Sequence, residues 1–249
     1  QLTVPDLKKF RIGVLREAMS TLPVNTEAQT LFDAALEDMR KAGAQVLDPV
    51  ISGIDLARQS DSSSIGVWPY EVIIAGDVYL KRLGPKRPFK TMKEMITTVG
   101  PDKFVDSYVM ALSYPPIDED PGFMRRYRGR QAIRDLVESL LTRYDLDAFV
   151  IQYVSTPPLA KSVSGSAAPA GGRDSRELRG GGIVSSAGLP GIVMPAGYTK
   201  DNLPVGIEFI GKSFDDLRLL QVAYGYEQAT KKRHSPQITP ALPGEKFDY

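Results

Sequence analysis

Two adjacent serines, Ser185 and Ser186, are the residues of this sequence best suited to chemistry at a carbonyl group. They follow three consecutive glycines within residues 180–188, an arrangement like a loop that presents a nucleophilic serine. Such a serine needs a base, yet the single histidine, His234, lies near the end of the chain without an acid at a recognisable spacing. No lysine lies in an apolar context that would lower its pKa enough to serve instead. We therefore expect these serines to line a pocket, where the glycines leave room for close approach.

A second segment matches the spacing of a phosphate-binding loop. Residues 206–213 have the sequence Gly-Ile-Glu-Phe-Ile-Gly-Lys-Ser and satisfy the pattern G-x-x-x-x-G-K-[ST]. That loop requires flexible backbone between a strand and the N-terminus of a helix. Here the intervening residues include two isoleucines and a phenylalanine, which favour a strand. We expect a strand, a turn and a helix start in this segment, with nucleotide binding as a weak alternative.

The composition excludes several other kinds of site. The chain has 249 residues, no cysteine and one histidine, which excludes a thiol nucleophile, a cysteine-type zinc site and an iron–sulfur cluster. We expect no metal and no cofactor. The 31 basic residues balance 30 acidic ones, so no strong field attracts nucleic acid. No apolar stretch approaches the ~20 residues that span a bilayer, and we expect neither a nucleic-acid nor a membrane partner.

The beginning of the chain predicts a β-α-β unit that would support such a pocket. Residues 11–15 form a short apolar run typical of a strand. Thr26 and Gln29 form a capping-box pattern, followed by apolar residues at helical spacing and by Gly43 as a C-terminal stop. Residues 44–47 predict the next strand. Two strands joined by one helix favour parallel pairing with a right-handed crossover.

The middle of the chain is predicted to be mainly helical. Trp68, Val72, Ile73 and Tyr79 are expected to be buried on the first of its helices. An irregular segment is expected over residues 100–122. The predicted helices cover residues 65–83, 91–98 and 123–144, and a strand follows at 148–151.

The last part of the chain alternates regular and irregular segments. Residues 155–182 are rich in Ser, Pro, Ala and Gly and predict an irregular loop. Strands at 191–194 and 205–210 with a turn between them predict a hairpin, and a helix follows to about residue 229. The tail, 236–249, is expected to be extended. The fold class is α/β, with a mixed, mostly parallel β-sheet flanked by helices.

Three segments near the end resemble the amidase signature family of enzymes. Residues 186–197 contain the family's A-G-L-P and P-A-G sequences, residues 202–217 contain L-P-V-G-I and G-K-S-F-D, and residues 219–230 end in Y-E-Q-A-T. The order and spacing agree over about fifty residues, and weaker similarity extends over essentially the whole chain. The resemblance implies the amidase signature fold.

The resemblance also implies where the catalytic residues lie. In this family a lysine, a bridging serine and a nucleophilic serine form the catalytic set, and all three precede the region that this chain resembles. No catalytic residue can therefore be assigned here. The resemblance implies that residues 1–249 are the C-terminal portion of a single amidase domain. Its partners would be the N-terminal part or chain of the same amidase and a small-molecule or peptide amide substrate. The compartment would be the cytoplasm, or the exterior if the N-terminal part carries a signal.

Substrate-binding residues are expected on several segments. The family's P-T-x-P loop corresponds to residues 152–157 here, a departure from the pattern. Arg134 matches the place of a substrate-binding arginine of amidotransferase members, although a solvated arginine is an alternative. Leu178 stands where those members have an aspartate, which favours a stand-alone amidase. A non-catalytic binding or structural subunit remains open. The expected substrate-binding residues are Tyr153, Ser155, Ser185, Ser186, Trp68 and Arg134.

Overall fold

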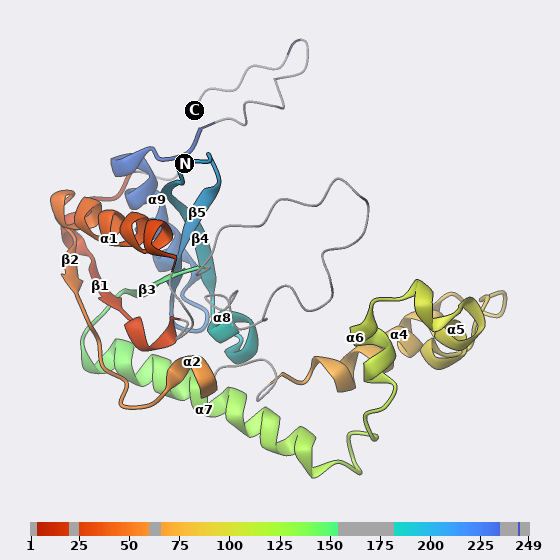
Figure 1. Cartoon of the computed structure of the whole chain (residues 1–249). Helices are drawn as coiled ribbons and strands as arrows, with labels where there is room; N and C mark the ends of the chain where they lie inside the picture. The colour runs from red at the N-terminus through yellow and green to blue at the C-terminus, as the bar shows by residue number, and fades with distance from the viewer. Residues whose placement is uncertain (1–3, 20–24, 60–65, 154–181, 235–243, 245–249) are drawn as a thin grey trace. The chain divides into compact units, whose positions relative to one another are not determined.

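The computed structural model describes residues 4–19, 25–59, 66–153, 182–234 and 244. The chain divides into two compact units, which Figure 1 draws together with the segments between them. The first unit comprises residues 1–61 and 133–249, and the second comprises residues 62–132. The predicted irregular loop and extended tail lie outside the described residues, apart from Gly182 and Gly244.

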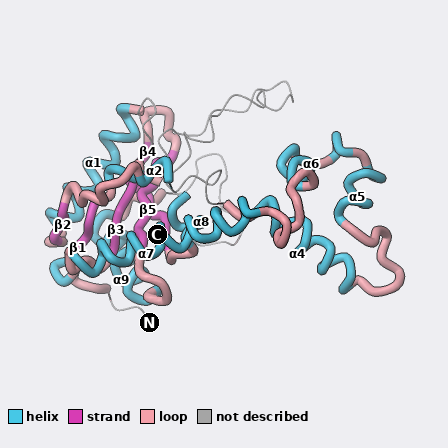
Figure 2. The backbone as a smooth tube through the Cα atoms, turned by 90° about the horizontal axis from the view of Figure 1, so that it is seen from below, coloured by secondary structure: helices cyan, strands magenta, loops and turns pink. Residues whose placement is uncertain are grey.

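A five-stranded sheet forms the centre of the first unit (Figure 2). The strand order is β2-β1-β3-β5-β4. β1 pairs in parallel with β2 and β3, whereas β5 pairs antiparallel with β3 and β4. The predicted mixed sheet flanked by helices is therefore confirmed. The strands are β1 (Arg11–Val14), β2 (Gln45–Leu47), β3 (Ala148–Gln152), β4 (Gly191–Tyr198) and β5 (Pro204–Ile210).

Helix α1 (Thr26–Lys41) joins β1 to β2 and completes the predicted β-α-β unit. The helix ends where expected, because Gly43 follows with a φ of 97°. Its start differs from the predicted capping box. The capping side chain is Asn25, which accepts a hydrogen bond from the Ala28 backbone N–H at 3.0 Å. Asparagine caps helices at least as well as threonine, so Thr26 becomes the first helical residue.

The larger hydrophobic core lies between the sheet and two helices, α1 and α9 (Asp216–Thr230). Because side chains alternate along a strand, every second residue of β1, β3 and β5 faces these helices. Burial of this apolar surface is the main favourable term in folding the unit. The core includes Ile12, Val14, Val150, Ile207 and Phe209 from the strands and Phe32, Leu36, Met39, Val222 and Tyr226 from the helices.

The opposite face of the sheet receives the alternate strand residues, among them Phe149, Ile151 and Glu208. Helix α8 (Gly182–Ala187) lies on this side, since Val184 occupies the space in front of Gly191 in β4. Helix α7 (Pro121–Arg143) buries Ile133, Val137, Leu140 and Leu141 along its second half. The short helix α2 (Leu56–Gln59) and two 3-10 turns, Leu7–Lys9 and Arg16–Ala18, complete the first unit.

The second unit is helical and has a much smaller core. Leu80, Met92 and Ile96 form its buried cluster. Residues 100–122 were expected to be irregular, but Asp106–Ala111 form a further short helix. This stretch contains no proline, which would interrupt a helix. No helix in the described parts of the chain is long and apolar enough to cross a membrane. The helices are α4 (Trp68–Arg82), α5 (Met92–Val99) and α6 (Asp106–Ala111), with a 3-10 turn at Pro101–Lys103.

Burial along α4 differs from the prediction. Trp68 is 41% exposed and Tyr79 is 62% exposed, although both were expected in the core. Tyr70 and Leu80 are buried instead. The reason is that α4 has few neighbours in a small unit, so the covered stripe is narrower than the apolar stripe of its sequence.

Candidate functional site

The described site residues of the first unit lie on two segments: Tyr153 follows β3, and Ser185, Ser186 and Arg134 lie on or beside helix α8. Tyr153 follows β3 directly, and its backbone N–H donates to the carbonyl oxygen of Gly206 in β5 at 3.0 Å. This bond continues the antiparallel pairing and fixes the backbone from which the half-exposed tyrosine side chain projects. Ser155 lies outside the described residues.

Helix α8 carries the two serines and is held by Arg134. Ser185 is exposed and Ser186 is buried. The Nε–H of Arg134 donates to the carbonyl oxygen of Ala187, the last residue of α8, at 2.7 Å. A cation at the C-terminal end of a helix satisfies carbonyls that lack intrahelical partners. The structure thus brings Arg134 to the serine-bearing helix, where it fixes the position of that helix.

Gly188 allows the close approach of Arg134 to the chain that follows α8. Gly188 has a φ of 67°, and a Cβ atom there would lie 2.8 Å from a terminal nitrogen of the Arg134 guanidinium. Any side chain at this position would therefore displace the arginine. The glycine at position 188 thus leaves room for the Arg134 side chain to reach the end of α8.

Glu208 is a buried carboxyl group that sequence analysis did not single out. It lies in β5 between Ile151 of β3 and Val193 of β4, and it is only 4% exposed. Its Oε2 atom has no hydrogen-bond partner among the residues that the structure describes. Burial raises the pKa of this carboxyl to about 7, because a charged form is disfavoured away from water. The detectable signal was one acidic residue inside an otherwise apolar strand.

Trp68 belongs to the second unit and not to the sheet-based group. Its ring packs edge-to-face on Tyr108, with 5.3 Å between the ring centroids. It leads directly into Pro69 and Tyr70, both of which line cavities of this unit. The predicted role of Trp68 in substrate binding is therefore a role of the second unit.

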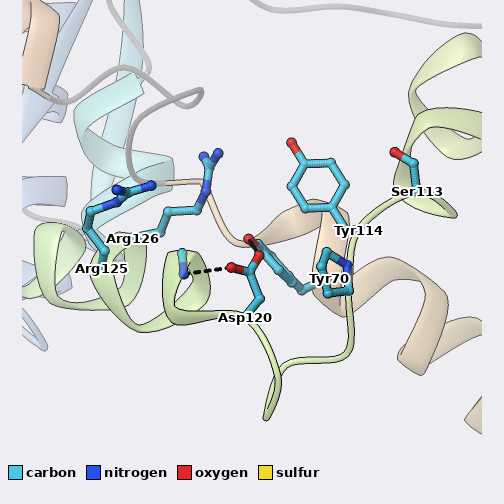
Figure 3. Close-up of a pocket in the computed structure, with 8 residues that line it drawn as sticks. Tyr70, Ser113, Tyr114, Asp120, Arg125 and Arg126 are labelled. Atoms are coloured by element: carbon cyan, nitrogen blue, oxygen red, sulfur yellow. Dashed lines mark hydrogen bonds between the residues drawn. The ribbon is translucent and has the colours of Figure 1, made fainter.

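A polar cavity of about 330 Å³ is the most chemically distinctive feature of the second unit. Figure 3 shows Tyr70 and Asp120 together, with the side chains of Arg126 and Tyr114 on either side. The Tyr70 hydroxyl donates to Oδ2 of Asp120 at 2.5 Å. The cavity is lined by Tyr70, Ser113, Tyr114, Pro115, Asp120, Gly122, Arg125 and Arg126.

The ionisable groups in this cavity shift one another's pKa values. The Tyr70 hydroxyl and the Gly122 backbone N–H, which donates to Asp120 Oδ1 at 2.7 Å, lower the pKa of Asp120, and Arg126 and Arg125 lower it further. Burial and the carboxylate of Asp120 raise the pKa of Tyr70. At neutral pH the Asp120 side chain is therefore a carboxylate and the Tyr70 side chain a neutral phenol, with the guanidinium groups of Arg125 and Arg126 beside them.

A second, more apolar cavity of about 480 Å³ adjoins the first. Tyr70, Tyr114 and Pro115 line both cavities. Neither cavity can be predicted from the sequence, because Tyr70 and Asp120 are 50 positions apart and no motif links them. The remaining lining of the second cavity is Pro69, Ile73, Ile74, Asp77, Thr91, Lys93, Ala111, Leu112, Pro116, Ile117 and Asp118.

The phosphate-loop alternative is wrong for residues 206–213. Strand β5 runs through Ile210, so the segment that would wrap a phosphate is extended and paired on both sides. The backbone N–H of Gly211 donates to Pro190 and that of Ser213 donates to Glu138 Oε1. These donors are thus engaged within the protein. In the described part of the chain, no three His, Asp or Glu side chains are grouped to hold a metal ion.

Comparison with known proteins shows a family and a fold. The family model described as Amidase matches residues 1–220. A glutamyl-tRNA(Gln) amidotransferase subunit of Synechococcus sp. (strain JA-2-3B'a(2-13)) is 24% identical over 262 residues, covering 97% of this chain and 47% of that protein. The corresponding subunit of Heliobacterium modesticaldum (strain ATCC 51547 / Ice1) is 55% identical over 47 residues, 19% of this chain and 9% of that protein.

Solved structures support the same fold. The peptide amidase of Stenotrophomonas maltophilia superposes with a TM-score of 0.66 at 22% identity, covering 93% of this chain and 45% of that one. An amidase family protein from Bacillus anthracis str. Ames gives a TM-score of 0.70 at 22% identity, covering 95% and 41%. The chain therefore spans about half the length of the relatives that it matches from end to end.

Proposed function

This chain belongs to the Amidase family, whose model matches residues 1–220, and from that premise we propose that it is the C-terminal portion of an enzyme that cleaves carboxamides. The family match carries the proposal. The five-stranded mixed sheet with helices on both faces supports it, because solved amidases share this fold. The expectation that residues 1–249 are one part of a single amidase domain is included in the proposal.

The proposed reaction passes through a serine ester. A serine oxygen from the N-terminal portion attacks the amide carbonyl carbon, the C–N bond breaks, and the nitrogen leaves with a proton as ammonia or an amine. Water then attacks the ester carbon, so that the acid leaves and the serine regains its proton. No residue of this chain takes part in these bond changes, and no cofactor is required.

This chain would supply one wall of the substrate pocket. Tyr153 and Ser155 would contribute from the segment after β3, and Ser185 and Ser186 from α8. Arg134 would act by holding α8 in place, as its bond to Ala187 supports, so it is a positioning residue in this proposal. Trp68 stays a predicted substrate contact of the second unit.

Ammonia transfer to an acceptor is a second candidate function. It is favoured by the relatives named as amidotransferase subunits, which cover nearly all of this chain. It is disfavoured by Leu178, which stands where those relatives are expected to have an aspartate. The two candidates differ in substrate: a glutaminase subunit prefers glutamine, whereas a stand-alone amidase accepts simple amides.

The decisive experiment compares this chain alone with the chain joined to a portion that carries the family's serine set. Ammonia release from glutamine and from aryl, alkyl and peptide amides is measured, and both proteins are treated with a fluorophosphonate. We expect the chain alone to be inactive and unlabelled, and the combined protein to be active and labelled outside this chain. Ser185→Ala and Ser186→Ala should leave the labelling unchanged.

Two outcomes would overturn the proposal. If the chain alone hydrolysed an amide and Ser186→Ala abolished that activity, the nucleophile would lie in this chain. If the combined protein neither released ammonia nor accepted the label, a non-catalytic binding or structural subunit would be the better interpretation.

A further inference from the structure

One face of helix α4 presents apolar side chains to solvent. Ile74, Val78 and Tyr79 are 49%, 46% and 62% exposed. At about 3.6 residues per turn, these positions lie along one side of the helix, and the exposed Ala75 lies between them. Leu80, which is buried in the core of the second unit, lies on the opposite side. A contiguous apolar face of this kind on a helix is typical of an interaction surface.

Charged side chains lie at the two ends of this face. Glu71 is in the first turn of α4 and Arg82 is in the last turn, and both are exposed. Neither of these two side chains makes a hydrogen bond or an ion pair within the part of the chain that the structure describes. We call the face the α4 stripe, and its residues are Glu71, Ile74, Ala75, Val78, Tyr79 and Arg82.

The spacing along the stripe is that of a helix-pairing seam. Glu71, Ala75, Val78 and Arg82 follow one another at intervals of four, three and four residues. Such intervals place side chains on a single line along a helix, as in the seam of a coiled coil. The line has two apolar residues in its middle, an acidic residue at one end and a basic residue at the other.

A second copy of the stripe is complementary to the first when the two helices run antiparallel. A twofold axis midway between Ala75 and Val78 places Ala75 of each copy opposite Val78 of the other. The same axis places Glu71 of each copy opposite Arg82 of the other. Twofold symmetry therefore produces two apolar contacts and two ion pairs from one set of residues, as homodimer interfaces do.

Other arrangements match the stripe less well. Two parallel copies would place Glu71 against Glu71 and Arg82 against Arg82, and like charges repel. A uniformly acidic or basic partner would match one end of the stripe and be repelled by the other. The small side chain of Ala75 near the middle of the line permits close approach of two helix axes.

We propose that the α4 stripe is the contact surface of a homodimer, in which a second copy of this chain packs antiparallel against it. One helix pair of this length gives a small interface, below about 1,200 Å². The association should therefore be reversible and depend on protein concentration. This inference goes beyond the proposed amide cleavage, because the contact uses no residue of the substrate pocket and needs no reaction.

Sedimentation velocity of the 249-residue chain at several concentrations measures the association. We expect monomer at low concentration and dimer at high concentration. Val78→Glu should weaken the dimer at least about tenfold, because it places a charge in the apolar middle of the contact. The new carboxylate lies four residues before Arg82, a spacing that supports the helix. Val99→Glu is the matched control, because Val99 is also 46% exposed but lies at the end of α5.

Charge variants test the antiparallel arrangement. Glu71→Lys makes both ends of the stripe basic, whereas Arg82→Glu combined with Lys81→Gln makes both ends acidic. Each variant alone should associate about tenfold more weakly than the parent chain, because like charges then meet at both ends. An equal mixture should form a mixed dimer, because each basic end then meets an acidic end. Lys86→Glu, which changes an exposed residue beyond α4, should have no effect.

Four results would overturn the proposal, once circular dichroism shows that each variant keeps its helices. The parent chain could stay monomeric at every concentration. A dimer that survived Val78→Glu would use another surface, and association lost in Val99→Glu as well would not be specific to α4. Charge variants that did not recover association on mixing would exclude the antiparallel pairing. None of these measurements uses amidase activity, so failure here is distinguishable from failure of the proposed function.

Discussion

The two units bury their apolar residues in different ways. In the first unit, strands and helices from both ends of the sequence close around one core, and side chains such as Phe32, Phe209 and Tyr226 are fully buried. In the second, one continuous segment of helices buries only a small cluster and leaves several large apolar side chains exposed: Trp68, Ile74, Val78, Tyr79, Leu83, Val105 and Met110. Long-range pairing thus produces a large closed core, whereas the local helices of the second unit enclose a much smaller one.

The largest effect is expected from the core of the first unit. Phe209→Ala should reduce the free energy of unfolding by about 3–5 kcal/mol, because it removes a buried ring and leaves a cavity between β5 and helices α1 and α9. Chemical denaturation followed by far-ultraviolet circular dichroism measures the change. A loss below about 1 kcal/mol would mean that the closed core contributes less than its burial implies.

The buried carboxyl of the first unit should make stability depend on pH. The pKa of Glu208 is about 7 in the folded chain and 4.5 for an ordinary glutamate. Between these values the folded state binds the extra proton, so stability falls as pH rises and then levels off above pH 7. Glu208→Gln removes this loss, and its advantage over the parent chain should grow by about 3 kcal/mol from pH 4 to pH 8.

Unfolding at several pH values tests this expectation, with Glu138→Gln as a comparison. Burial is the cause of the Glu208 shift, whereas the pKa of Glu138 is lowered by hydrogen bonding from Ser213, whose backbone N–H donates to Glu138 Oε1. The two variants should therefore have opposite pH trends. If Glu208→Gln had the same effect at both ends of the range, the carboxyl would be paired or hydrated in solution.

A smaller effect is expected in the core of the second unit. Ile96→Ala should cost about 2 kcal/mol, at the low end for buried isoleucine, because a three-residue cluster can collapse around the gap. Trp68 fluorescence follows this unit. The fluorescence transition should move to lower denaturant concentration more than the circular dichroism transition does. Equal movement of both would show that the two units unfold as one.

The smallest effects compare matched helix caps. Asn25 accepts from the Ala28 N–H at 3.0 Å in the first unit, and Thr91 accepts from the Glu94 N–H at 3.1 Å in the second. Asn25→Ala and Thr91→Ala should each cost about 1 kcal/mol. Only Thr91→Ala should shift the Trp68 transition selectively. A Thr91→Ser variant, which keeps the hydroxyl, should behave like the parent chain.

The success of sequence analysis differs between the units for a physical reason. Strands 11–15 and 205–210 and the helix after Asn25 are predictable, because residues that must all face one large core have a clear periodicity. The same periodicity on α4 placed Trp68 and Tyr79 in a core too small to cover them. Periodicity identifies the apolar face of a helix but not whether a partner covers it.

The sites differ in the same way. The place of Arg134 could be inferred from a family resemblance, but its bond to Ala187 depends on residues 53 positions apart. The Tyr70–Asp120 pair leaves no pattern in the sequence at all. Glu208 is a different case, because its alternation places it on a buried face and the single charge in that strand was visible.

The strand order carries a consequence for synthesis. β1 lies between β2 and β3. β3 is far along the chain from β1: Asp147, just before β3, accepts a hydrogen bond from the Arg11 backbone N–H and is 136 positions after Arg11. At about 5–20 residues per second, a ribosome needs about 7–30 s to add that length. During this interval β1 can pair with β2 but not with β3, and the edge that β3 later covers stays open to strands of neighbouring nascent chains. The β2–β1–β3 arrangement thus makes the speed of translation, and the chaperones that shield an open edge, part of what determines the yield of folded protein.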